Sequence, residues 1–152
     1  YIRIGRATDT KVDYKFKVGK GVELKGGDDA TIIATGATVY DAYQAALELD
    51  KQNIKTRVIN IHTIKPFDKK IILKAASETD TILTVEEHQL IGGLRDCVAS
   101  AILESNKSDI KFKGLGIKDV FCSFNGTYDD IKEYYGLTKD DIINELKLLY
   151  ER

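Results

Sequence analysis

Short apolar runs rich in β-branched residues recur along the chain, and their regular spacing constrains the fold more than any other feature. The runs begin near residues 31, 56, 81 and 111, about 25 to 30 residues apart, and Thr31–Thr35 and Thr81–Val85 are typical. The stretches between them carry apolar residues at helical spacing, as in Val39, Ala42 and Ala46. One strand and one helix per interval is a βαβ unit, and strands this apolar are covered on both faces. The spacing therefore predicts an α/β fold, a three-layer α/β/α sandwich with a mostly parallel sheet of about five strands.

Capping and breaking signals predict where the helices begin. The pairs Thr38–Asp41 and Thr138–Asp141 have the spacing of a capping pair. Asp68 is expected to be the N-cap of the helix that follows the single proline. Residues 127–135 and Asp140–Tyr150 are expected to form two closing helices, and the second of them is amphipathic, so we expect it to dock on the domain.

The first 29 residues depart from this pattern. They are predicted to contain a short strand at Tyr1–Ile4, and residues 12–24 alternate weakly with lysines, as in an edge hairpin or an extended connector. Residues 1–20 hold six basic and two acidic residues, whereas residues 127–152 hold seven acidic and four basic ones. This asymmetry is a mild indication of an interface, although a solvated surface explains it at least as well.

Composition excludes several classes of protein. With 23 Lys and Arg against 24 Asp and Glu the net charge is −1, so no overall field attracts nucleic acid or an anionic membrane. No apolar run approaches the roughly 20 residues that span a bilayer, and no signal-peptide core is present. Cys97 and Cys122 lack metal-ligand spacing and are expected to be reduced and buried. We therefore expect a cytoplasmic protein with no metal site and no membrane or nucleic-acid partner.

Ligands of open α/β sheets bind beyond the carboxyl ends of the strands, where Thr35–Thr38, His62–Pro66 and Glu86–Gly93 are expected. The glycine spacing of a dinucleotide or P-loop site is absent, so nucleotide binding is weakly supported. His62 fits a structural histidine better than a catalytic one. Arg6 follows a predicted strand, where an arginine can clamp a phosphate, but the residues alone indicate a surface arginine.

Glu86, Glu87 and His88 form the densest titratable cluster in the chain. Adjacent carboxylates of a strand point to opposite sides, which is poor geometry for an acid/base pair, so a structural or interface role is favoured over catalysis or ligand binding. Gly92–Gly93 opens the next helix, where free amides could hold an anion. Close packing of that helix on the sheet is the favoured interpretation of the two glycines.

The chain contains no methionine and opens on Tyr1. An initiator methionine is normally trimmed only before a small residue, and tyrosine is not small. We therefore expect this chain to be a piece of a longer polypeptide, which warns against expecting a complete active site.

Four segments in order resemble the C-terminal domain of the transketolase family of thiamine-diphosphate enzymes. They are residues 27–36 (GDDATIIATG), 58–68 (VINIHTIKPFD), 85–94 (VEEH with GGL) and 135–138 (YGLT). Each motif is weak alone, but four in order at this spacing are specific, and the resemblance covers about residues 1–147. One departure is Phe121–Gly126, where relatives commonly read Phe-Gly-x-Ser-Gly, so the conformation of that loop is open.

The resemblance implies a function for a parent enzyme. That enzyme would move a two-carbon ketol unit between sugar phosphates, using thiamine diphosphate and Mg²⁺ bound by domains that precede this one. The cofactor signature of the family, Gly-Asp-Gly followed at a distance by Asn-Asn, does not occur here. We therefore expect no catalytic, cofactor-binding or metal-binding residue in this chain, and the isolated chain is expected to be inactive.

By the same resemblance, residues 1–26 are a remnant of the preceding pyrimidine-binding domain plus a linker, and residues 27–152 form the transketolase C-terminal-like domain. Arg6 would contact the substrate phosphate in the parent and be misplaced in the fragment. The domain itself would be mainly architectural, packing on the preceding domains and extending a homodimer contact. The expected contributors to that contact are Glu86, Glu87, His88, Gly92, Gly93 and the closing helix Asp140–Tyr150.

Three alternatives stay open from the sequence. The parent could be a deoxyxylulose-phosphate synthase, whose C-terminal domain is related. The chain could instead be a free-standing flavodoxin-like module that binds an anion or ligand, with Gly92–Gly93 as the anion site. It could also be an interaction domain without an enzymatic parent.

Overall fold

A five-stranded sheet forms the middle layer of the domain. The computed structural model describes every residue except 3–13, 106, 108 and 152, so Arg6 and half of the predicted first strand lie outside the described residues. The strand order is β1-β3-β2-β4-β5, and only β1, at one edge, is antiparallel to its neighbour. The strands are β1 Val22–Lys25, β2 Ala30–Ala34, β3 Thr56–Asn60, β4 Thr81–Gln89 and β5 Lys111–Ile117. The predicted mostly parallel sheet of five strands is confirmed.

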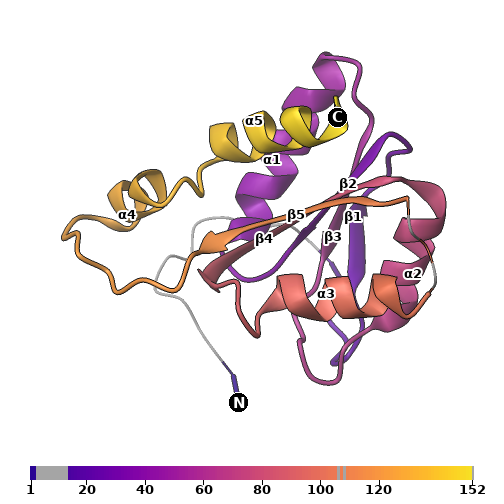
Figure 1. The fold of residues 1–152 in the computed structure, drawn as a ribbon, viewed down its shortest axis with the longest axis horizontal. Coiled ribbons are helices and arrows are strands. Elements are labelled where there is room, and N and C mark those ends of the chain that lie inside the picture. Colours follow the sequence, from indigo (N-terminus) through magenta and orange to yellow (C-terminus); the bar gives the residue numbers. More distant parts are fainter. Residues whose placement is uncertain (3–13, 106, 108, 152) are drawn as a thin grey trace.

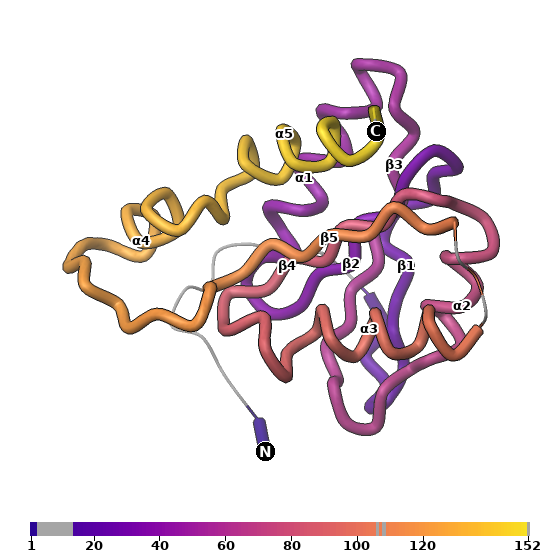
Figure 2. Tube along the Cα trace, viewed as in Figure 1, coloured from indigo at the N-terminus to yellow at the C-terminus, as the bar shows by residue number. Residues whose placement is uncertain are grey.

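Helices cover both faces of the sheet, which confirms the three-layer α/β/α sandwich (Figure 1). The helices are α1 Thr38–Lys51, α2 Lys69–Glu78, α3 Leu94–Leu103, α4 Tyr128–Tyr134 and α5 Lys139–Tyr150. α1 and α5 pack on one face, and α2 and α3 pack on the other. β2 and β3 are buried along their whole length because both of their faces meet helices. In the tube view, α4 and the stretch before it project beyond the layers (Figure 2).

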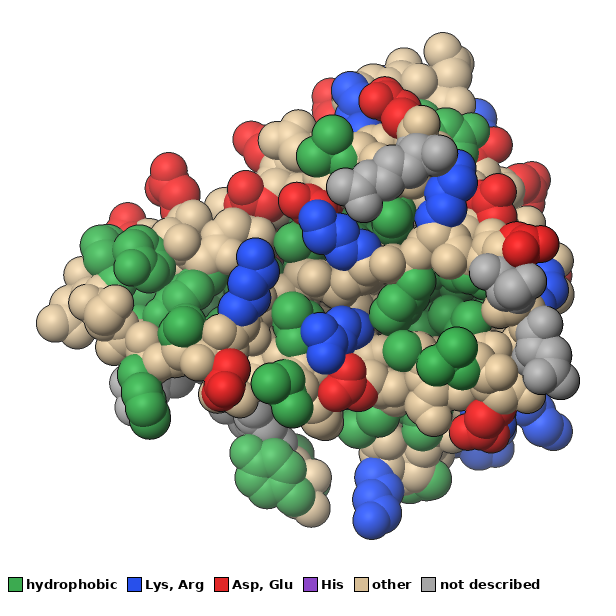
Figure 3. Space-filling model, in the orientation of Figure 1, with side chains coloured by type: hydrophobic (Ala, Val, Ile, Leu, Met, Phe, Trp, Pro, Cys, Tyr) green, Lys and Arg blue, Asp and Glu red, His purple; other side chains and the backbone are tan. Residues whose placement is uncertain are grey.

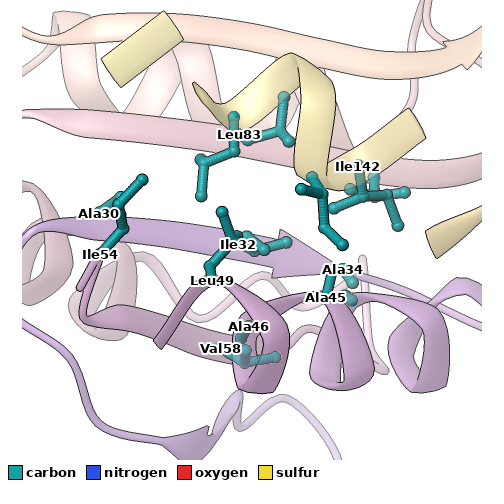
Figure 4. Close-up of a cluster of buried hydrophobic side chains, with 14 of the residues drawn as sticks. Ala30, Ile32, Ala34, Ala45, Ala46, Leu49, Ile54, Val58, Leu83 and Ile142 are labelled. Atoms are coloured by element: carbon teal, nitrogen blue, oxygen red, sulfur yellow. The ribbon is translucent and has the colours of Figure 1, made fainter. Parts of the chain in front are cut away.

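The core beneath α1 and α5 is built from small residues on α1 and branched residues on the strands (Figure 4). Ala45 and Ala46 let α1 approach Ile32 of β2, and all three side chains are fully buried. α5 adds Ile142 and Leu146 to the same cluster. The closing helix is therefore part of the core, as its amphipathic pattern predicts.

The capping signals give a mixed outcome. The Thr138–Asp141 capping box is present: the Thr138 side chain accepts a hydrogen bond from the Asp141 amide, and the Asp141 carboxylate accepts one from the Thr138 amide. The Thr38–Asp41 prediction is wrong, because α1 begins after Ala37 without a side-chain cap. The Thr38 hydroxyl instead lies 3.1 Å from the carbonyl oxygen of Val85 on the neighbouring strand β4.

Two further sequence predictions need correction. Asp68 does precede α2, but its side chain does not cap the helix; it accepts a hydrogen bond from the Gly21 amide at 3.1 Å and so ties down the segment before β1. The apolar run around Cys122 predicts a buried thiol, yet Cys122 is exposed, and Cys97 is only partly buried. Cys122 is exposed because it follows β5, beyond which no strand or helix of the described residues covers it.

We predict that Thr138→Ala lowers the free energy of unfolding by about 1 kcal/mol, because the first turn of α5 loses an acceptor for one of its free amides. Urea unfolding followed by circular dichroism measures the change. Thr138→Ser keeps the hydroxyl and is the matched control. Equal losses in the two variants would contradict a capping role.

No helix among the described residues is both long and apolar enough to cross a membrane.

Candidate functional site at the carboxyl edge of the sheet

Strand β4 runs four residues past its predicted end at Val85, so Glu86, Glu87 and His88 lie within the strand. Successive side chains of a strand alternate between the faces of a sheet. Glu86 accordingly meets the start of α3, on one face, and Glu87 meets α4, on the other. The two carboxylates therefore have different roles and do not form an acid/base pair.

Glu86 is a buried carboxylate that caps a helix from a neighbouring strand. It has no exposed surface, and its two oxygens accept hydrogen bonds from the amides of Leu94 at 2.7 Å and Arg95 at 2.9 Å. Free amides and the helix dipole make the start of a helix a favourable place for a negative charge. His88 Nδ1 lies 2.9 Å from the same carboxylate. These partners explain how a glutamate is accommodated in the interior.

The glycines at the start of α3 make room for this carboxylate. A Cβ at Gly93 would collide with the Glu86 carboxylate, and it would come within 2.6 Å of a backbone oxygen. Gly92 has φ +73°, a conformation that favours glycine, and its amide donates to Asp96 at 2.7 Å. The alternative of an anion at Gly92–Gly93 is therefore not supported, since Glu86 and Asp96 already accept hydrogen bonds from the amides at this turn.

Four side chains, which we call the α4 latch, connect α4 to the sheet edge and to α1: Asp41, Glu87, Tyr128 and Lys132. The Tyr128 hydroxyl donates to Glu87 at 2.7 Å, and the Lys132 ammonium lies 2.9 Å from the Asp41 carboxylate. Burial, together with the hydrogen bond to Glu87, raises the pKa of Tyr128 well above its ordinary value. Burial alone would lower the pKa of Lys132, but the ion pair with Asp41 outweighs it and the pKa is raised. Tyr128 therefore stays neutral and Lys132 stays charged at neutral pH.

His62, at the carboxyl end of β3, contacts the segment that leads into β1. Its ring centroid lies 4.5 Å from that of Phe16, and its Nδ1 lies 2.8 Å from the Thr63 hydroxyl. Burial lowers the pKa of His62, so the ring is neutral at pH 7. Its other ring nitrogen, Nε2, is buried without a partner among the described residues. The contacts with Phe16 and Thr63 hold the ring in place, and the structural role of His62 stays a prediction.

The predicted site residues do not form one continuous surface. Glu86 and Gly93 are buried, Glu87 and His88 are partly exposed, and Gly92 is exposed. Sequence reasoning missed Tyr128, Lys132 and Asp41, because Asp41 and Lys132 are 91 positions apart and no motif connects them.

The donor set at this edge does not suit thiamine diphosphate or its Mg²⁺. Within the described residues, no three His, Cys, Asp or Glu side chains gather where they could hold a metal ion. The amides at the start of α3, which could have bound a diphosphate, are occupied by Glu86. We therefore derive no catalytic step through the cofactor from these residues.

The contribution of Asp96 to the stability of the fold is expected to depend on pH. The hydrogen bond from the Gly92 amide and that from Arg95 lower the pKa of Asp96 below its ordinary value of 3.8. A carboxyl whose pKa is lower in the folded state stabilises the fold above its unfolded pKa, and this contribution is lost as the pH falls through the folded-state value. We expect the difference in urea midpoint between the native chain and Asp96→Asn to be present at pH 7 and to shrink below about pH 4. A difference that stayed constant down to about pH 3 would contradict this.

The sheet order, the helices on both faces and the carboxyl-edge geometry define an α/β sandwich domain, and comparison with known proteins gives its family. The family described as "Transketolase, C-terminal domain" matches residues 19–142. The chain therefore belongs to the transketolase C-terminal domain family.

Two curated transketolase subunits and one solved structure are similar over nearly the whole chain. An apulose-4-phosphate transketolase subunit of Phocaeicola vulgatus is 42% identical over 146 residues, which cover 93% of this chain and 46% of that protein. The 6-deoxy-6-sulfo-D-fructose transketolase subunit SqwH of a Clostridium species is 36% identical over 155 residues, covering 100% and 47%. A solved structure described as "Split gene transketolase, inactive beta4 tetramer" matches with a TM-score of 0.88 and 33% identity, covering 97% of this chain and 48% of that one. The chain thus spans about half the length of these relatives.

A synthase is also among the relatives. The 1-deoxy-D-xylulose-5-phosphate synthase of Halothermothrix orenii is 42% identical over 136 residues, which cover 89% of this chain and 21% of that protein.

Proposed function

We propose that this chain supplies the C-terminal domain of a transketolase-type transferase, which moves a two-carbon ketol unit between sugar phosphates. The observation that carries the proposal is the match of nearly the whole chain to about half of a transketolase subunit, at 42% identity. The fold supports it, since the solved structure with a TM-score of 0.88 is a split-gene transketolase. The sugar specificity stays open, because the substrates named for the two curated subunits differ from each other.

In this parent enzyme the domain would have an architectural role. Thiamine diphosphate and Mg²⁺ would be bound by the preceding domains of the parent, with residues 1–26 as the connection to them and 27–152 as the accessory domain. Arg6 is proposed to contact the substrate phosphate there, and a guanidinium has the geometry for that contact. The parent is proposed to be a cytoplasmic homodimer that acts on sugar phosphates of the pentose phosphate pathway.

Burial narrows the set of residues that could form the proposed dimer contact. Glu86 and Gly93 are buried, so they would shape the contact from within, while Glu87, His88 and Gly92 are the members that a partner could touch. Ile142 and Leu146 of α5 are buried in the core of the domain. Only exposed residues of this helix, such as Leu148, could contact a partner subunit. Charge reversal at Glu87 in the parent enzyme is the test, because an unchanged assembly state would count against this contact.

A synthase parent is the second candidate, and the 42% identity to a 1-deoxy-D-xylulose-5-phosphate synthase favours it specifically. The complete parent enzyme should be assayed for two reactions with the cofactor present: ketol transfer between sugar phosphates, and formation of 1-deoxy-D-xylulose 5-phosphate. Ketol transfer alone is the result we expect. Formation of the deoxy sugar phosphate would replace the first proposal with the second. If the enzyme catalysed neither reaction, both proposals would be overturned.

A further inference from the structure

Hydrophobic side chains that the core leaves exposed gather in two places. One is the end of the molecule where α4 lies (Figure 3). The other is the segment that leads into β1, where Phe16 is 63% exposed and Val18 is 64% exposed. Residues 14–21 of this segment, which we call the strap, are described throughout and form neither helix nor strand. Contacts other than a helix or sheet ladder must therefore hold the strap on the domain.

The connection between β3 and α2 holds one end of the strap. The strap lies against residues 61–68, and the two segments run side by side in the tube view (Figure 2). A Cβ at Gly19 would come within 2.8 Å of Pro66 Cγ, so the backbone of the strap touches the loop directly. The Gly21 amide donates a hydrogen bond to the Asp68 carboxylate at 3.1 Å. These two contacts fix the end of the strap that is next to β1.

His62 holds the other end of the strap. Its ring stacks on that of Tyr14, with centroids 5.8 Å apart and an angle of 8° between the planes, and it lies 4.5 Å from the ring of Phe16. The hydroxyl of Thr63, 2.8 Å from Nδ1, orients the imidazole. Since residues 14–17 have no ladder to a neighbouring strand, this cluster of rings is the contact that keeps them on the domain.

A positive charge on the imidazole is disfavoured at this place. Burial lowers the pKa of His62 below its ordinary value of 6.5, and it outweighs interactions with the backbone of His62 and Lys20 that raise the pKa. Nε2 is buried without a hydrogen-bond partner among the described residues. The faces of aromatic rings attract a cation, which works against release, but Phe16 is largely exposed and water weakens this attraction.

The charged groups beside His62 also oppose a further positive charge. The strap and the loop of residues 61–68 together carry four lysines and one acid, and the start of α2 adds two more lysines: Lys15, Lys17, Lys20, Lys65 and Asp68, with Lys69 and Lys70. The acid, Asp68, already accepts from the Gly21 amide and lies 3.8 Å from the Lys20 ammonium. Protonation would therefore place the imidazolium in a positively charged neighbourhood.

We propose that His62 is a pH-sensitive fastener: the neutral ring holds the strap on the loop of residues 61–68, and protonation of the ring releases it. In the released state water reaches the ring, which then binds a proton at its ordinary pKa. The released state thus binds more protons, so lowering the pH below about 6.5 favours release, by up to about tenfold per pH unit. The inference does not depend on the proposed transferase activity. In the proposed parent it would make the connection through residues 1–26 sensitive to pH.

The first test follows the strap by NMR of the 152-residue chain between about pH 8 and about pH 5. We expect the imidazole of His62 to titrate below about 6.5, and the amide signals of Gly19 and Gly21 to move with the same midpoint. The amide of Ile32, in the core, should not move, which shows that the fold is intact. Movement of the glycine signals with a midpoint near about pH 4 would assign it to a carboxyl such as Asp68 and overturn the proposal.

Two variants make this test specific. His62→Phe keeps an aromatic ring but cannot take up a proton, so the signals of Gly19 and Gly21 should no longer respond to pH. His88→Gln is the matched control, because it removes the other histidine of the chain and should leave the response unchanged. A response that persists in His62→Phe, or a titration of His62 that leaves both glycine signals in place, would overturn the proposal.

Proteolysis at about pH 8 tests the fastening itself, where His62 is neutral. Trypsin cleaves after lysine, and cleavage after Lys15 and Lys17 reports the population of the released strap when opening is fast. His62→Asn removes the ring, so cleavage at these lysines should be faster on the order of 3- to 10-fold. His62→Phe should stay close to the native rate. Equal rates in the native chain and His62→Asn, or equally fast cleavage in both variants, would show that the ring does not hold the strap.

Discussion

Replacing Glu86 with alanine is expected to lower the free energy of unfolding by about 3 kcal/mol, since two hydrogen bonds to a buried carboxylate are lost and the amide of Leu94 stays buried without an acceptor. For a domain of this size, a loss of about 3 kcal/mol corresponds to a fall in melting temperature of about 6–12 °C. Thermal and urea unfolding measure both quantities. The loss should be accompanied by faster amide exchange in the first turn of α3, because that turn has lost its cap.

The neighbouring residue provides the control. Glu87→Gln changes a carboxylate on the same strand that is only partly buried, and Gln can still accept the hydrogen bond of Tyr128, so the loss should stay below about 1 kcal/mol. Glu86→Gln should fall between the two, because the amide side chain keeps the shape but offers one acceptor where two are needed. Equal stability of the Glu86 and Glu87 variants would contradict the capping role.

The second large effect is expected for Leu146→Ala on α5, at about 3–4 kcal/mol. Leu146 is fully buried between α1 and the sheet, so truncation removes buried methyl groups and leaves a cavity. Urea unfolding measures the loss. Leu148→Ala is the matched control on the same helix, because Leu148 is 55% exposed, and it should cost less than about 0.5 kcal/mol. Similar losses at the two positions would mean that α5 is not docked as described.

The fold could be predicted because its signals are local. Strand β2 is a run of β-branched residues, and Thr138 with Asp141 lie close enough in sequence to be recognised as a capping box. The spacing of the strands then limits the topology, since parallel neighbours need crossovers of this length. Thr38 is not a cap because it is already the first residue of α1. Its hydroxyl donates to two carbonyl oxygens, that of Thr35 at 2.9 Å and that of Val85 on β4 at 3.1 Å, and the second contact cannot be read from the strand spacing.

The candidate site is harder to predict because its contacts are long-range and its burial is unusual. Glutamate is rarely buried, so the sequence around Glu86 suggests a cluster of surface charges. Only the two glycines at the start of α3 indicate that this helix approaches the strand closely. The run around Cys122 is apolar enough for a buried strand, but it lies beyond β5, where the sheet ends. The exposure of Cys122 can be inferred only once the strand order and the end of β5 are known.

These residues are proposed to form an accessory domain of a transketolase-type enzyme whose cofactor is bound by other domains. Thermal unfolding of this chain with and without thiamine diphosphate and Mg²⁺ tests it most directly, with the complete parent enzyme measured in parallel. A ligand at about 100 times its dissociation constant stabilises by about 2.7 kcal/mol, which is a melting shift on the order of 5–10 °C. We expect that shift in the parent and none in this chain. A clear shift in this chain would place a cofactor site within its 152 residues and contradict the accessory role.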